Sequence, residues 1–110
     1  MVKVMGAFCK RADLTPQQFR DYYEKHHVPL IRSLLPGMTS YKRNYVQAGG
    51  WPAPPFDVIT EIVYESPEAL ARSREIMTDP EVVKRIQDDE HKFIDRRSAI
   101  TYIVDEVASE

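Results

Sequence analysis

Two adjacent histidines precede a proline in the segment DYYEKHHVPLI, residues 21–31. Histidine gains and loses a proton near neutral pH, which suits it to general acid or base chemistry. His27 follows Tyr23 by four residues and precedes Leu30 by three, so a helix places it on the flank of an apolar stripe. Pro29 lacks an N–H group, and the break it causes frees backbone groups that can bond the ring or a bound water. We interpret His27 as a candidate proton-transfer residue; a structural histidine bonded to a backbone carbonyl is the alternative.

The other two histidines are weaker candidates. His26 lies four residues after Tyr22 and four before Leu30, nearer the centre of the stripe, so we expect it to be packed and hydrogen-bonded. His91 stands in the charged run DDEHK and is expected to be exposed. Consecutive residues of a helix point about 100° apart, so the acidic residues 88–90 do not converge on a metal ion. We predict that they form a solvated face.

The segment FDVITEIVY, residues 56–64, contains a candidate carboxylate that could assist His27. Asp57 lies near the start of this predicted strand and is a candidate to orient His27 or to share its proton. The alternative is a strand-end carboxylate that caps a turn or pairs with Arg43. Glu61 lies on the same face of the strand and would need a partner if it were buried.

Aromatic residues supply most of the candidate ligand-binding groups. Tyr41, Tyr45 and Tyr102 could line a cavity with hydroxyls for a phenol or carbonyl, although strand tyrosines also serve simple sheet packing. Trp51, in the loop AGGWPAPP, is either a lid over a cavity or an anchor in a dimer interface. The candidate substrate-binding residues are Tyr23, Tyr41, Arg43, Trp51 and Phe93.

Composition argues against several classes of function. The 110 residues fit one domain, and the formal net charge of -2 gives no electrostatic reason to expect nucleic acid or an anionic membrane as a partner. The single cysteine, Cys9, allows no intramolecular disulfide and no multi-cysteine metal site. No apolar run approaches the ~20 residues of a membrane helix, and the N-terminus lacks a secretory pattern. We expect a soluble, cytoplasmic protein with no metal and no cofactor.

Predicted strands and helices position these residues. Alternation of apolar and polar residues predicts strands over residues 2–10, 38–47, 56–64 and 100–105. The sequence TPQQ, residues 15–18, is a capping-box start for a helix with a kink or break at Pro29 and an end at residues 36–37. A second helix is predicted over residues 66–77, and helical spacing resumes over residues 79–94.

The order of these elements predicts an α+β, ferredoxin-like βαββαβ fold with a four-stranded antiparallel sheet. Helices cover only one face of such a sheet, but the strands at 2–10 and 56–64 carry apolar residues on both faces. A second copy is the simplest cover, which gives a homodimeric α/β barrel with a cavity between the sheets. RNA binding is the rival use of an open sheet face, but Asp57 and Glu61 have the wrong charge for it.

Three segments, in this order, resemble the EthD family: Phe19…Tyr23…His27-x-Pro29-Leu30, then FDVITEIVYESPEAL led by Asp57, then Asp89-Glu90-x-x-Phe93-x-Asp95. The resemblance runs from Lys3 to about Glu106, so we take residues 1–106 as one EthD-like domain and residues 107–110 as a loose tail. It implies a dimeric α/β barrel with a small apolar ligand cavity. It also makes His27, rather than His26, the counterpart of the family's characteristic histidine. Where the pattern often has Trp, this chain has Tyr23, whose hydroxyl needs a partner.

Together these residues and this resemblance predict a small enzyme that acts on a small apolar or aromatic oxygenated compound. His27 would move a proton and Asp57 would orient or tune it, in elimination or isomerisation or in forming an anion that reacts directly with oxygen. The resemblance links members to oxidative degradation, and relatives to dehydration or decarboxylation of aromatic polyketides. The alternatives are a carrier of a hydrophobic intermediate for a partner oxygenase, and a haem protein with His27 as an axial ligand.

Overall fold

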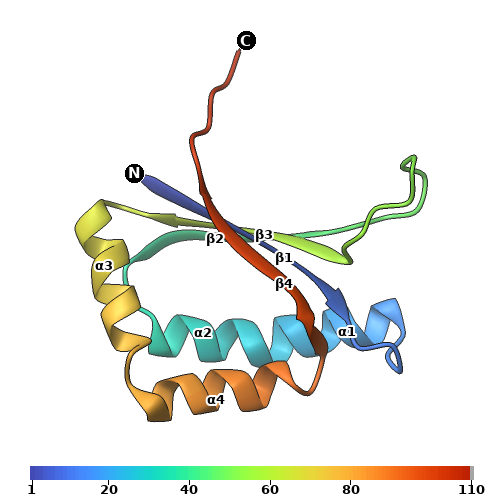
Figure 1. Cartoon of the computed structure of the whole chain (residues 1–110), viewed down its shortest axis with the longest axis horizontal. Coiled ribbons are helices and arrows are strands. Elements are labelled where there is room, and N and C mark those ends of the chain that lie inside the picture. The colour runs from blue at the N-terminus through green and yellow to red at the C-terminus, as the bar shows by residue number, and fades with distance from the viewer. Residues whose placement is uncertain (110) are drawn as a thin grey trace.

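The computed structural model describes residues 1–109 as a four-stranded antiparallel sheet with helices on one face (Figure 1). The strands are β1 (Val2–Lys10), β2 (Met38–Tyr45), β3 (Val58–Tyr64) and β4 (Ile94–Val104), in the order β2-β3-β1-β4 across the sheet. The helical segments are α1 (Pro16–Tyr22), the π-helical turn η1 (Tyr23–His27), α2 (Val28–Leu34), α3 (Pro67–Ile76) and α4 (Pro80–Glu90). This arrangement confirms the predicted ferredoxin-like α+β fold.

The first helix begins at the capping box that the sequence predicts. Thr15 Oγ1 accepts a hydrogen bond from the backbone N–H of Gln18 at 3.1 Å, and Gln18 Oε1 accepts one from the N–H of Thr15 at 2.9 Å. These two bonds satisfy donors that a helix start leaves free. They therefore fix where the helix that carries His27 begins.

The predicted break at Pro29 takes the form of one π-helical turn within a continuous helical rod. The N–H of Val28 donates to the carbonyl of Tyr23, five residues back, so η1 holds one residue more than an α-helical turn. Each residue of a π turn rotates the chain less, which shifts the side chains that follow. His27 is thereby buried and His26 is exposed. The expectation that His26 is the packed histidine is wrong for this reason.

The last strand begins at Ile94 rather than at residue 100. Phe93 and Ile94 are both buried, and their spacing fits a helix as well as the start of a strand. Ile94 pairs with Lys10 on β1, and the register between β1 and β4 then shifts beside Cys9. Ser98 stabilises this irregular pairing, because its hydroxyl oxygen accepts a hydrogen bond from the N–H of Cys9 at 2.8 Å.

One face of the sheet packs on the helices and holds the core. On β1 the side chains of Val4 and Phe8 contact buried residues of this layer, whereas Lys3 and Met5 point to the other face. The larger group of buried residues consists of Phe19, Tyr23, Val28, Val58, Phe93 and Ile94.

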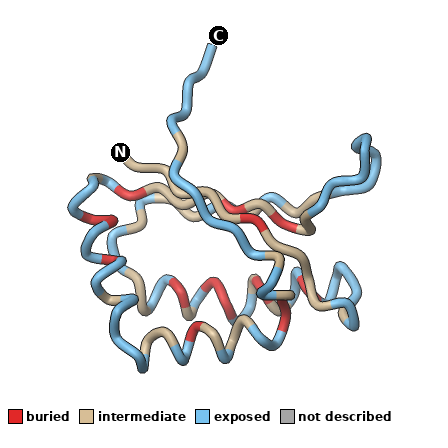
Figure 2. The backbone as a smooth tube through the Cα atoms, in the orientation of Figure 1, coloured by how far each residue is buried: buried red, intermediate tan, exposed pale blue. Residues whose placement is uncertain are grey.

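The opposite face is not covered by any helix of residues 1–109, and most of β4 is exposed (Figure 2). Ile100 and Tyr102 lie on this face, because they pair with Ala7 and Met5 of β1, and both are exposed. Lys3 and Glu61 form an ion pair there at 2.7 Å, which supplies the partner that the sequence requires for Glu61. This face is therefore part apolar and part charged.

Two segments extend beyond the sheet (Figure 1): the loop between β2 and β3, residues 46–57, and the C-terminal tail after β4. Trp51 lies in the loop and is 94% exposed. Within residues 1–109 we find no helix with the length and apolar character needed to span a membrane.

Candidate functional site

His27 and Asp89 form a hydrogen-bonded pair between η1 and α4. Nδ1 of His27 lies 2.9 Å from Oδ2 of Asp89, and the other carboxylate oxygen of Asp89 accepts a hydrogen bond from the hydroxyl of Tyr22. His27 is 5% exposed and the side chain of Asp89 13% exposed, so solvent screens this pair little. A carboxylate oxygen only accepts, so Nδ1 carries the proton and the neutral ring has its lone pair on Nε2.

The Nε2 atom of His27 has no hydrogen-bond partner among residues 1–109. Every side-chain nitrogen or oxygen that is fully shielded from solvent in residues 1–109 has a hydrogen-bond partner. The only bond to the His27 ring within these residues is made at Nδ1, so Nε2 is unpaired and is not fully shielded from solvent. The ring is thus held at one nitrogen and unpaired at the other, as a general base requires.

The environment of His27 favours its neutral form. Burial lowers the pKa of His27 below its ordinary value of 6.5, and the carboxylate of Asp89 opposes this effect without cancelling it. At neutral pH Nε2 therefore carries a lone pair that can accept a proton. Burial and the bond to Asp89 raise the pKa of Tyr22 to about 12, so its hydroxyl keeps its proton and continues to donate to Asp89.

Asp57 does not contact His27 in this structure; the carboxylate that does so is Asp89. Asp57 precedes β3, where its Oδ2 accepts a hydrogen bond from the N–H of Lys10 at 2.9 Å. It lines a hollow of about 270 Å³ together with Phe19 and Tyr45. The carboxylate is therefore engaged at the end of β1, and the predicted partnership with His27 is replaced by one with α4.

The prediction that the acidic residues 88–90 form a solvated face is wrong for two of the three residues. The side chain of Asp88 is exposed and pairs with Lys84, but Asp89 and Glu90 are only partly exposed. Asp89 lies three residues after the buried Ile86 and four before the buried Phe93, so it belongs to the apolar side of α4. That spacing is the signal in the sequence that could have identified Asp89.

Tyr23 and Phe93 surround His27 with aromatic rings. The centroid of the His27 ring lies 4.8 Å from that of Phe93 and 5.5 Å from that of Tyr23, and both aromatic residues are buried. The hydroxyls of Tyr23 and Tyr41 are hydrogen-bonded at 2.8 Å, which gives Tyr23 the partner its hydroxyl needs. Burial raises the pKa of Tyr41 to about 12, so its hydroxyl stays protonated at neutral pH.

Arg43 supports Tyr41 from two residues further along β2, on the same face of the sheet. Its guanidinium lies 4.9 Å from the ring centroid of Tyr41 and pairs with Glu24 at 2.6 Å. The hydrogen bond to Arg43 lowers the pKa of Glu24, and the hydroxyl of Tyr45 also donates to this carboxylate. The predicted ligand-binding arginine is thus already paired, and Glu24 is its unforeseen partner.

Trp51 is separate from this group. It lies in the projecting loop, is almost fully exposed, and forms no aromatic pair with the cluster around His27. His26, on the outer side of η1, lies against Tyr22 with ring centroids 4.7 Å apart. His91 is exposed, as predicted.

An apolar row crosses the helix-facing side of the sheet from Tyr41 to the edge strand β4. The strand register places Ile62 opposite Tyr41, Val4 opposite Ile62, and Ile103 opposite Val4. Val4 and Ile62 are half-buried, whereas Ile103 is 53% exposed although it lies on the side that faces the helices. Apolar side chains therefore run from Tyr41 to the edge of the sheet, and Val4 and Ile62 in the middle of the row pack against a buried cluster.

The next row of the sheet has a glycine at its centre. Gly6 pairs with Thr60 on one side and Thr101 on the other. A Cβ atom on Gly6 would lie 2.8 Å from Oγ1 of Thr60, a separation that real side chains do not tolerate. Glycine is therefore needed here, because the hydroxyl of Thr60 fills the space that a side chain would take.

The groups around His27 are hydrogen-bonding and titratable side chains rather than a cluster of metal ligands. Across residues 1–109, no three or more histidine, cysteine or acidic side chains converge as they would around a metal ion. The groups present are one imidazole, two carboxylates and several tyrosine hydroxyls, beside an apolar strip. These groups can bind an oxygen atom and move a proton.

Sequence and structure comparisons agree with this fold. The EthD domain matches residues 11–97. A comparison with curated proteins gives no significant match. An EthD family protein of Bacillus halodurans is 22% identical, with a TM-score of 0.69, covering 97% of this chain and 100% of the other.

Two further structures share the fold at lower identity. A dimeric protein of unknown function with a ferredoxin-like fold, from Bacteroides fragilis, is 10% identical with a TM-score of 0.60, covering 96% of this chain and 95% of the other. SnoaB, a cofactor-independent oxygenase from Streptomyces nogalater, is 10% identical with a TM-score of 0.60. The match covers 98% of this chain and 94% of the other. Because the EthD domain matches most of its length, the chain belongs to the EthD family.

Proposed function

We propose that this protein is a small enzyme that binds a small apolar or aromatic oxygenated molecule and uses His27 to remove a proton from it. The observation that carries the proposal is the His27 ring, which is fixed by Asp89 at Nδ1 and has no partner at Nε2. A histidine with a purely structural role has no need of an open, unprotonated nitrogen. We replace Asp57 by Asp89 as the residue that orients the ring.

The chemistry follows from the protonation states. At neutral pH, Nε2 of His27 accepts a proton from a C–H group next to a carbonyl, or from a phenol. The imidazolium that forms is stabilised by the carboxylate of Asp89, which Tyr22 holds in place. Such a step supports elimination or isomerisation.

The class of substrate is supported by the row of side chains that begins at Tyr41, which is linked to His27 through Tyr23. The row formed by Tyr41, Ile62, Val4 and Ile103 offers one hydroxyl at its inner end and apolar side chains toward the edge. A ligand with an oxygen atom at one end and an apolar or aromatic body matches this pattern. Trp51 lies in the projecting loop, outside this row.

A second copy of the chain is the proposed cover of the open sheet face. Ile100 and Tyr102 expose apolar surface there, beside the ion pair of Lys3 and Glu61. The Bacteroides fragilis structure of the same fold is described as dimeric. We propose a homodimeric barrel in the cytoplasm, serving an oxidative degradation pathway.

A cofactor-independent oxygenase is the second candidate, favoured by the fold shared with SnoaB. In that case His27 would deprotonate a phenol to an electron-rich anion, which reduces molecular oxygen directly. Oxygen uptake with a phenolic compound, lost in His27→Gln, would distinguish this reaction from isomerisation. A carrier of a hydrophobic intermediate would bind such a compound without turnover.

The test uses nitrobenzisoxazole, an aromatic oxygenated probe that opens to a coloured phenolate when a base removes its C–H proton. We expect wild-type protein to accelerate ring opening and His27→Gln to lower the rate by about 100-fold or more. His26→Gln is the matched control, because His26 is the exposed neighbour and should leave the rate unchanged. If His27→Gln keeps the wild-type rate, the proposal fails; if it only weakens binding of nitrophenol, the carrier is favoured.

A further inference from the structure

A hollow of about 270 Å³ lies between the start of α1, the end of β1 and the base of the loop between β2 and β3. It is smaller than the ~300–1,000 Å³ of pockets that take drug-sized ligands, so it suits a smaller molecule. Neither His27 nor Asp89 lines it, which separates it from the site described above. Three charged and three apolar or aromatic residues form most of its lining: Lys10, Arg20 and Asp57, with Pro16, Tyr45 and Val46.

Arg20 is a cation without an ion-pair partner among residues 1–109. The ordinary partner of an arginine at this position would be Glu24, four residues later in the same helical rod. Both oxygens of Glu24 are already occupied. Oε1 pairs with Nη2 of Arg43 at 2.6 Å, and Oε2 accepts bonds from Nε of Arg43 and from the hydroxyl of Tyr45. The N–H groups of Arg20 are therefore left for another acceptor.

The ring of Tyr45 holds this guanidinium at the hollow. The central carbon of the Arg20 guanidinium lies 4.7 Å from the centroid of the Tyr45 ring. The ring is itself fixed, because it packs edge-on against Phe19 with centroids 6.2 Å apart and its hydroxyl donates to Glu24. A guanidinium over an aromatic ring gains cation–π attraction without using its N–H donors. Those donors form a planar fork that matches the two oxygens of a carboxylate.

Asp57 forms another wall of the hollow and is held by three hydrogen bonds. Its N–H donates to the carbonyl of Phe8 at 3.1 Å, its carbonyl accepts from the N–H of Val46 at 2.9 Å, and its Oδ2 accepts from the N–H of Lys10 at 2.9 Å. Nζ of Lys10 reaches only the carbonyl of Arg11, at 3.4 Å. The lining thus carries two cations and one carboxylate. This balance favours an anion, and the carboxylate of Asp57 would repel a second negative charge on it.

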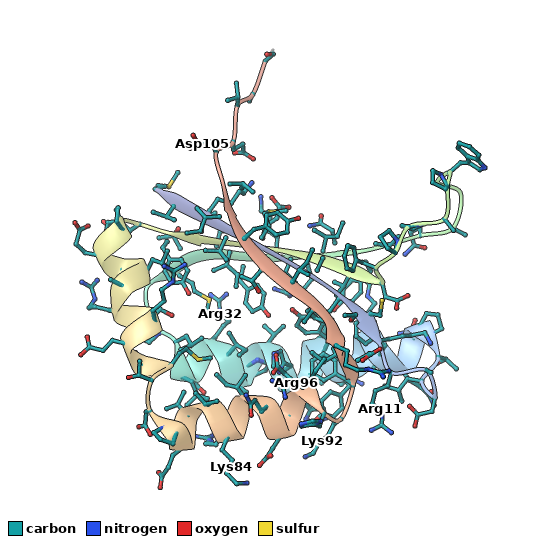
Figure 3. The ribbon with its side chains drawn as sticks, in the orientation of Figure 1. Arg11, Arg32, Lys84, Lys92, Arg96 and Asp105 are labelled. Carbon is teal, nitrogen blue, oxygen red and sulfur yellow. The ribbon has the colours of Figure 1, made fainter. Side chains whose placement is uncertain are left out.

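A larger hollow, of about 540 Å³, lies between the segment after β1 and the start of β4, but it offers no comparable cation. Each of the three arginines that line it is paired with an acidic residue: Arg11 with Asp13, Arg96 with Glu90 and Arg97 with Asp95. Figure 3 shows two of them, Arg11 and Arg96, at the level of the helices. The unpaired guanidinium of Arg20 therefore distinguishes the smaller hollow.

We propose that the smaller hollow is a binding site for a small monocarboxylate with an apolar or aromatic body. The carboxylate pairs with the free N–H groups of Arg20, and the body of the ligand lies against Pro16, Tyr45 and Val46. The site is separate from that of His27 and does not depend on the function proposed there.

NMR titration with sodium benzoate tests the site. We expect benzoate to shift the Nε–H signal of Arg20, assigned by its loss in Arg20→Gln, and the backbone amide signal of Val46, from which the Kd is measured. Arg20→Gln should raise this Kd about tenfold or more. Benzamide, which has the same shape without the charge, should bind the wild type about tenfold more weakly or worse. Acetate should also bind more weakly, because it lacks the apolar body.

Two control variants separate this site from a general attraction of anions. Arg97→Gln removes an exposed arginine of the larger hollow and should leave the Kd for benzoate unchanged. Tyr45→Phe keeps the ring beneath Arg20 and should also keep the Kd, whereas Tyr45→Leu removes the ring and should raise it. The proposal is overturned if benzoate leaves the Arg20 signal unchanged, if benzamide binds as tightly as benzoate, or if Arg20→Gln and Arg97→Gln weaken binding equally.

Discussion

Asp89 and His27 are 62 positions apart in the sequence, yet Oδ2 of Asp89 lies 2.9 Å from Nδ1 of His27. Two separate features bring them together. The π turn rotates His27 into the layer between helices and sheet, and the spacing from Ile86 places Asp89 on the inner side of α4. The properties of the imidazole therefore depend on the register of both helices.

Removal of the Asp89 charge should weaken both the site and the fold. In Asp89→Asn the pKa of His27 should fall further, because the carboxylate is the group that raises it against burial. We expect ring opening of nitrobenzisoxazole to slow about tenfold or more, and the free energy of unfolding to fall by about 1–3 kcal/mol. Imidazole NMR titration, kinetics and urea unfolding check these effects. An unchanged His27 pKa in Asp89→Asn would show that the bond is not maintained in solution.

The buried His27 should make stability depend on pH. Its pKa is lower in the folded protein than the 6.5 of an unfolded chain, because burial disfavours the imidazolium. The stability that His27 contributes is therefore present above the unfolded pKa and is lost as the pH falls through the folded value. Urea unfolding of wild type and His27→Gln, from about pH 8 to about pH 5, should show the gap between them narrowing on acidification. A gap that stays constant or widens would contradict the buried, neutral ring.

Local patterns in the sequence predict most of the elements. The capping box of residues 15–18 and the alternation in residues 2–10 depend only on near neighbours, and both are confirmed. The start of β4 is missed because Phe93 and Ile94 are buried in either a helix or a strand, and only pairing with Lys10 decides between them. That pairing joins residues far apart in the chain.

The site is predicted less completely than the fold. An ideal helix puts His26 near the buried stripe, and only the bond from Val28 to Tyr23 shows that the rod has a π turn. Asp57 is singled out because it leads a strand, although its carboxylate bonds the backbone of Lys10. Contacts between distant segments, such as that of Asp89 with His27, leave only a weak spacing signal in one sequence.

Gly6 should be intolerant of any side chain. A Cβ atom would approach Oγ1 of Thr60 to 2.8 Å, so Gly6→Ala is expected to lower the free energy of unfolding by about 1–3 kcal/mol. Thr60→Ala removes the obstructing hydroxyl. In a protein that carries Thr60→Ala, the Gly6→Ala change should therefore lower the free energy of unfolding by less than it does in the wild type. Urea unfolding of the two single variants and the double variant measures this coupling. Strictly additive effects would mean that the two residues do not collide.

The open face of the sheet should hold the dimer together. Tyr102 and Ile100 are exposed there, and in a two-fold dimer a charge at Tyr102 would be buried in both copies. We expect wild-type protein to sediment as a dimer at micromolar concentration and Tyr102→Glu as a monomer that retains its secondary structure. Met77→Glu is the matched control, because Met77 is an exposed apolar residue at the end of α3, on the helical layer. A monomeric wild type, or a Tyr102→Glu variant that remains dimeric, would exclude this face as the interface.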